Sequence, residues 1–110
     1  MRQSKSTAVR AILELIENRE GCRRTPVECK LGRYLPDHQF PWMKSSDAFM
    51  GRINFAGDRE FLYPGEITEV VVSFFSKPEL DEKLKPGMSW DIKEGHRIVG
   101  KGKLIEVLDT

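Results

Sequence analysis

The chain has 110 residues, of which 39% are hydrophobic and 32% are charged, and its formal net charge at pH 7 is +1. This size fits one globular domain with a modest core, and the hydrophobic content is too high for a disordered chain. The near-neutral charge excludes a global nucleic-acid signature, although residues 1–33 hold eight Lys or Arg against four Glu. No run reaches the apolar length of a membrane helix and no signal-peptide core follows the first residues, so a cytoplasmic location is expected.

Residues 1–7 are polar and are expected to be flexible, with one folded domain over residues 8–110. The stretch from Ala8 to Glu20 fits two secondary structures. Its apolar residues recur at helical spacing, and Gly21 could cap a helix. Alternate residues are also apolar, which is typical of a strand; this set is Val9, Ala11, Leu13 and Leu15. Periodicity alone favours the helix.

The middle of the chain is predicted to hold one loop and three strands. Residues 34–47 form the loop because Pro36 and Pro41 interrupt them. The predicted strands are Ala48–Phe55, Glu60–Tyr63 and Ile67–Phe75. The last of these is nearly continuously apolar, which indicates a strand covered on both faces. The charged, proline-bounded residues 76–86 are predicted to be another loop.

The last third of the chain predicts a hairpin that closes a β-structure. Trp90 and Ile92 share one face of a strand, and Gly95 supplies a turn because glycine tolerates positive φ. A second strand then runs over residues 97–108. Its alternate glycines, Gly100 and Gly102, indicate a strand that bends or lies close to another backbone, as at a barrel corner.

This hairpin resembles the final hairpin in the third, C-terminal β-barrel of translation elongation factor Tu. The family's pattern there is Arg-Glu-Gly-Gly-Arg-Thr-Val-Gly-Ala-Gly, and residues 93–102 depart from it at His96, Ile98 and Lys101. The informative matches are Glu94, Gly95, Arg97, Val99, Gly100 and Gly102. Two more segments match in the same order. Residues 20–26 resemble the barrel's Glu-Gly-Gly-Arg-His-Thr-Pro loop, and residues 63–66 resemble its Met-Pro-Gly-Asp turn.

The resemblance implies an all-β fold, a single antiparallel Greek-key barrel of about six strands. It places a strand at Ala8–Ile16, a hairpin turn at 18–21 and a returning strand at Val27–Leu31. In the factor this barrel has no catalytic role; it packs on the other domains and contacts the T-stem backbone of aminoacyl-tRNA. The chain has no counterpart of the GTP-binding domain and no phosphate-binding loop, so no bound nucleotide is expected.

The residues that could carry catalysis are few. His38 lies in the proline-bounded loop and His96 in the hairpin turn, and both are expected to be polar surface residues. Cys22 and Cys29 are expected to be reduced thiols, because their spacing fits no zinc motif. We therefore expect no catalytic residue, no cofactor and no metal, and we do not expect an enzyme.

A protein partner is the first prediction for function. An isolated barrel of this family would expose the flank that normally packs on neighbouring domains. Phe40 and Trp42 are candidate anchors, since aromatic side chains concentrate interface energy. The alternative for Trp42 is a plug at one end of the barrel.

RNA binding through the tRNA backbone is the second prediction. The resemblance aligns Glu94 and Gly95 with the hairpin near the tRNA, and basic residues could position phosphates without reading sequence. The complete candidate set for RNA is Arg19, Arg23, Arg24, Thr25, Arg52, Glu94, Gly95 and Arg97. Asp37 stands where the family has glutamine and would repel a phosphate. A third alternative is a regulatory or immunity protein that mimics the factor's domain.

Overall fold

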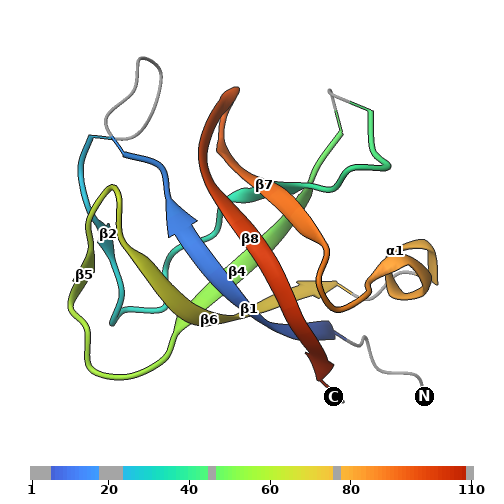
Figure 1. Cartoon of the computed structure of the whole chain (residues 1–110), viewed down its shortest axis with the longest axis horizontal. Coiled ribbons are helices and arrows are strands. Elements are labelled where there is room, and N and C mark those ends of the chain that lie inside the picture. The colour runs from blue at the N-terminus through green and yellow to red at the C-terminus, as the bar shows by residue number, and fades with distance from the viewer. Residues whose placement is uncertain (1–5, 18–23, 45–46, 76–77, 109–110) are drawn as a thin grey trace.

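The computed structural model describes residues 6–17, 24–44, 47–75 and 78–108 (Figure 1). The described chain is almost entirely β-structure, with one short helix. Its elements are β1 (Ser6–Leu15), β2 (Val27–Glu28), β3 (Asp37–Gln39), β4 (Phe49–Phe55), β5 (Phe61–Leu62), β6 (Ile67–Phe75), α1 (Pro78–Lys83), β7 (Ser89–Glu94) and β8 (Arg97–Leu108). Within these residues no helix has the length and apolarity needed to cross a membrane.

Six of the strands form a closed antiparallel barrel in the order β1-β6-β4-β3-β7-β8. The barrel closes because β1 pairs with β8 along most of its length (Figure 1). The order is not a simple up-and-down meander, since β1 lies between two strands from the second half of the chain. The prediction of an all-β barrel with six strands is therefore confirmed.

The β1 strand settles the ambiguity between helix and strand in favour of the strand. The set Val9, Ala11, Leu13 and Leu15 is buried in the core, as the alternation of a half-buried strand requires. The strand begins at Ser6, two residues before the expected start. Thr7, expected in the flexible segment, is buried, and its hydroxyl donates a hydrogen bond to Asp81 Oδ1 at 2.5 Å. Pairing on both edges overrides the helical propensity of this segment.

The predicted return strand at Val27–Leu31 is wrong in its length and in its partner. Only Val27–Glu28 form a strand, β2, and it pairs with β5 in a separate two-stranded sheet. The physical reason is that β6 and β8 occupy the two edges of β1, so no edge remains for β2. The predicted turn at 18–21 lies outside the described residues.

The β6 strand was expected to be covered on both faces, and this expectation is wrong. Val70, Val72 and Phe74 are buried, while Ile67 is 56% exposed. Because the interior of a small barrel accepts only alternate side chains, a continuous apolar run still presents one face to the surface.

Two elements lie where loops were predicted. β3 occupies Asp37–Gln39, inside the proline-bounded loop, and α1 occupies Pro78–Lys83. The helix contributes Leu80 to the core, and Leu84 follows one turn later. Figure 1 shows α1 beside the region where β6 ends and β7 begins.

Gly100 brings β8 close to β1, as the alternate glycines predicted. A Cβ at this position would lie 2.8 Å from the backbone oxygen of Glu14. We expect Gly100→Val to lower the free energy of unfolding by about 1–3 kcal/mol, because β1 would have to shift. Urea unfolding measures this change. Lys103→Val is the matched control on an exposed position of β8 and should change the stability by only about 0.5 kcal/mol. Equal unfolding midpoints for the two variants would contradict the close approach.

Candidate functional site

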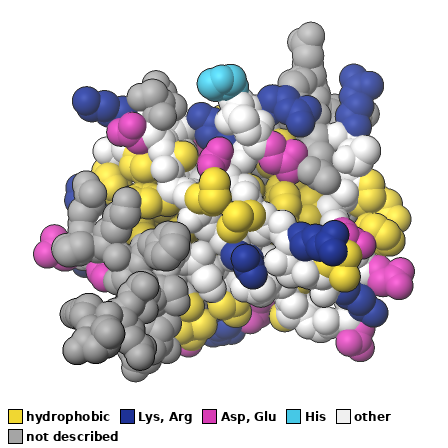
Figure 2. Space-filling model, turned by 180° about the vertical axis from the view of Figure 1, so that it is seen from behind, with side chains coloured by type: hydrophobic (Ala, Val, Ile, Leu, Met, Phe, Trp, Pro, Cys, Tyr) yellow, Lys and Arg dark blue, Asp and Glu magenta, His cyan; other side chains and the backbone are white. Residues whose placement is uncertain are grey.

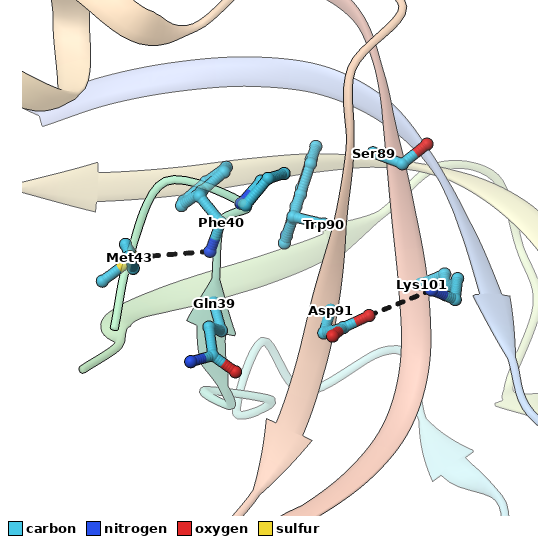
Figure 3. Close-up of a pocket in the computed structure, with 8 residues that line it drawn as sticks. Gln39, Phe40, Met43, Ser89, Trp90, Asp91 and Lys101 are labelled. Carbon is cyan, nitrogen blue, oxygen red and sulfur yellow. Dashed lines mark hydrogen bonds and ion pairs between the residues drawn. The ribbon is translucent and has the colours of Figure 1, made fainter. Parts of the chain in front are cut away.

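The end of β3 creates a gap in the wall of the barrel. β3 ends at Gln39. Pro41, two residues later, has no backbone N–H with which to continue the ladder. The chain turns instead: the Met43 N–H donates to the Phe40 carbonyl at 3.0 Å, and the Phe40 N–H contacts the Met43 sulfur at 3.3 Å. In Figure 3 this turn leads the chain away from β7.

A hollow of about 360 Å³ lies beside this turn (Figure 3). It is formed by the end of β3, the turn itself, the first residues of β7 and one residue of β8. Its lining residues are Gln39, Phe40, Pro41, Met43, Ser89, Trp90, Asp91 and Lys101. Half of these residues are apolar or aromatic and half are polar or charged, so the hollow can make both kinds of contact. We call this feature the β3–β7 groove.

The polar rim of the β3–β7 groove is held by side-chain interactions. Lys101 Nζ lies 3.1 Å from Asp91 Oδ1, and Lys93 Nζ donates to Gln39 Oε1 at 3.0 Å. The Gln39 amide also donates to the Lys44 carbonyl at 2.7 Å. The rim is therefore ordered by its own contacts and carries charges of both signs.

The floor of the β3–β7 groove is aromatic. The Phe40 and Trp90 rings have centroids 5.1 Å apart, and Trp42 stacks on Phe40 at 4.8 Å. Lys83 Nζ lies 5.4 Å from the centre of the Trp42 ring, a distance at which cation–π attraction operates. Phe40 is only 1% exposed, so it shapes the floor from within the core, and its role as a partner anchor stays a prediction. Trp42 is partly buried and packs against the core, which resembles the predicted plug.

His38 lies in the core behind this floor, and the prediction of a surface histidine is wrong. Its side chain is fully buried, with the Phe74 ring edge-on at 4.9 Å. The Trp90 indole N–H donates to His38 Nδ1 at 2.9 Å, and Nε2 lies 3.0 Å from the Gly51 carbonyl. These contacts fit a neutral ring protonated on Nε2. Burial lowers the pKa of His38 to about 4, and the Gly51 carbonyl opposes this shift.

The β7–β8 hairpin presents the residues predicted near RNA. Gly95 has φ of 65°, as its turn requires. Glu94 is engaged on two sides, since its carboxylate accepts a 2.7 Å hydrogen bond from the Tyr34 hydroxyl and lies 3.7 Å from Arg97. Arg97 remains half exposed. The turn at Gly95 is thus exposed to solvent beside Glu94 and Arg97, whose opposite charges partly offset each other.

The other predicted RNA residues are dispersed. Arg24 and Thr25 are exposed and precede β2, whereas Arg52 is exposed on β4, opposite Ser73 of β6. Figure 1 shows β2 at the left edge of the molecule and the β7–β8 hairpin at the top. Arg19 and Arg23 lie outside the described residues. Among the described candidates, the structure brings only the hairpin residues together.

A second exposed apolar group lies near β5. The Phe61 and Tyr63 rings are 6.2 Å apart, and the side chains are 39% and 51% exposed. Figure 2 shows the molecule from behind, where charged and other side chains divide the hydrophobic ones into several groups. The β3–β7 groove differs from this group because it is hollowed and has a buried floor.

Sequence reasoning missed most of the β3–β7 groove. The rim residues Gln39, Ser89, Asp91 and Lys101 were not singled out. Pro41 was the available signal, because a proline just after a short strand marks the place where pairing must stop. Within the described ranges, no three His, Cys, Asp or Glu side chains gather as metal ligands would. A search against protein-family models gave no match for the chain.

Proposed function

We propose that the protein is a non-catalytic binding module that engages a protein partner through the β3–β7 groove. The observation that carries this proposal is the hollow itself, with its buried aromatic floor and its ordered, charged rim. Interfaces typically combine an aromatic centre with a polar margin. His38, whose pKa is lowered by burial, is enclosed and makes two hydrogen bonds, which favours a structural role for it.

The sequence resemblance supports a module of this class. The third barrel of elongation factor Tu acts by contact and carries no catalysis, and we propose the same mode of action for this chain. Its partner would be a protein that meets one side of the barrel. RNA is the less favoured partner because the carboxylate of Glu94 is held at the hairpin by a hydrogen bond from Tyr34 and an ion pair with Arg97. A carboxylate there opposes the approach of a phosphate.

Site-specific photo-crosslinking tests this function. A photoreactive amino acid replaces Ser89 in the β3–β7 groove, and the same amino acid replaces exposed Asp58 in the matched control. We expect light-dependent adducts with a protein from cells that produce this chain, formed from position 89 and weak from position 58. An excess of unmodified protein should remove them.

The chemistry of the adduct decides between partners. Adducts that proteases degrade and nucleases leave intact support a protein partner. Adducts that nucleases degrade would indicate that the partner is RNA. Equal adducts from the two positions would show that the β3–β7 groove is not the binding surface.

A further inference from the structure

The main chain of β7 has an open edge at Ser89. β7 pairs with β8 from Ser89 to Glu94, but β3 covers its other edge only from Asp91 to Lys93. Continued in register, Pro41 would face Ser89, and proline has no N–H to offer. The turn that follows β3 also leads away from β7 (Figure 3).

Strand alternation fixes the direction of the Ser89 main-chain groups. The Leu104 N–H donates to the Met88 carbonyl at 2.8 Å, so this carbonyl faces β8. In an antiparallel ladder the N–H and C=O of one residue point to the same side, and successive residues alternate. Ser89 therefore points to the other side, toward the β3–β7 groove. β3 pairs with β7 only from Asp91 to Lys93, so it offers Ser89 no ladder partner on that side.

The side chains around this edge define what could add to it. The aromatic floor of Phe40 and Trp90 lies on the inner side of this edge. On the outer surface, β8 places Lys101 opposite Asp91 and Lys103 opposite Ser89. Lys103 is exposed and makes no ion pair with any described residue. An added strand would direct alternate side chains to these two environments.

We propose that the β3–β7 groove binds an extended peptide segment that pairs with β7 at Ser89. This inference rests on the function proposed above and specifies the form of the partner. The segment alternates large apolar residues, which contact the aromatic floor, with acidic residues beside Lys101 and Lys103. Main-chain hydrogen bonds provide affinity and the alternate side chains provide selectivity, as in other cases of strand addition.

Synthetic peptides and the intact chain test the mode of binding. The probe is an acetylated, amidated hexapeptide of alternating Glu and Leu with Phe as the central apolar residue. A peptide of the same composition, with its three Glu grouped together, is the matched control. Backbone amide shifts in NMR spectra follow binding. We expect changes near Gln39, Ser89 and Lys101 with the alternating peptide, and about tenfold weaker binding with the grouped one.

N-methylated peptides and two Ser89 variants isolate the main-chain pairing. N-methylation at one peptide position should weaken binding about tenfold, since it removes a hydrogen bond and blocks the edge. Ser89→Pro should also weaken binding about tenfold, because it removes the Ser89 N–H on the edge of β7 that β3 leaves uncovered. Ser89→Ala keeps that N–H and should bind like the original chain.

Three results would overturn strand addition. The first is no binding at about 1 mM peptide. The second is equal binding of the alternating and grouped peptides. The third is equal binding of every N-methylated form, which would indicate a docked side chain without pairing. If Ser89→Pro fails to fold, the N-methylated series with the original chain decides. A protein adduct from position 89 together with failed peptides would leave the proposed function standing and reject strand addition.

Discussion

Lowering the pH from 7 to 4 is expected to remove about 3 kcal/mol from the free energy of unfolding through His38 alone. Burial lowers the pKa of this histidine from 6.5 to about 4 in the folded chain. The unfolded chain therefore takes up the proton first as the pH falls. The stability that the neutral ring supports is complete above pH 6.5 and is lost as the pH falls toward 4.

The geometry explains why the folded state resists protonation. A proton on Nδ1 would place an N–H against the Trp90 indole N–H, which now donates to that nitrogen at 2.9 Å. Two donors would then face each other in a buried site, and the charge would lack a partner.

His38→Gln separates this effect from the titration of carboxylates. A glutamine amide offers an oxygen to Trp90 and an N–H to the Gly51 carbonyl, and it does not titrate. Urea unfolding at several pH values should show a lower stability than the original chain at pH 7 but a flatter dependence on pH. His96→Asn, at an exposed position, is the matched control and should keep the original slope. Identical slopes for the original chain and His38→Gln would contradict this account.

Gly102→Val should destabilise the barrel by about 3 kcal/mol or more, at the upper end of overpacking effects. A Cβ at this position would lie 2.6 Å from Cζ2 of Trp90. Trp90 is opposite Gly102 in the β7–β8 ladder, and its hydrogen bond to His38 restrains the ring. The indole cannot move aside without losing that bond.

A second substitution tests this explanation. Trp90→Phe removes the ring atoms that the new side chain would meet, at the cost of its own hydrogen bond to His38. The double variant should therefore be more stable than the sum of the two single changes predicts, by at least about 1 kcal/mol. Thermal and urea unfolding measure the four members of the cycle. Additive effects would mean that Gly102 matters for a reason other than its contact with Trp90.

The turn at Gly95 and the alternate glycines of β8 predicted the closing hairpin from local patterns. The strand at β1 was predicted only through the resemblance, because periodicity alone favoured a helix. β3 and α1 were missed because three and six residues are too few to show a period. β2 was assigned to the wrong partner, since a two-residue strand contains no information about its neighbour.

The site was less predictable than the fold. The β3–β7 groove exists because residues 39–43 meet the distant β7–β8 hairpin where β3 stops, and no local sequence pattern predicts that contact. His38 shows the same limit. Its burial depends on Trp90, Gly51 and Phe74, which come from three different strands. A polar residue between prolines is indistinguishable from a loop residue until those strands are assembled.

The pairing of β1 with β6 and β8 also determines when this protein can finish folding. β1 is synthesised first, yet both of its neighbours come from the second half of the chain. Pairings between residues distant in sequence form slowly, because loop-closure entropy must be overcome before the contacts form. During synthesis, the apolar set of β1 therefore remains without a partner until β6 and then β8 have left the ribosome. The nascent chain, with this strand uncovered, is the form most exposed to aggregation and to capture by chaperones.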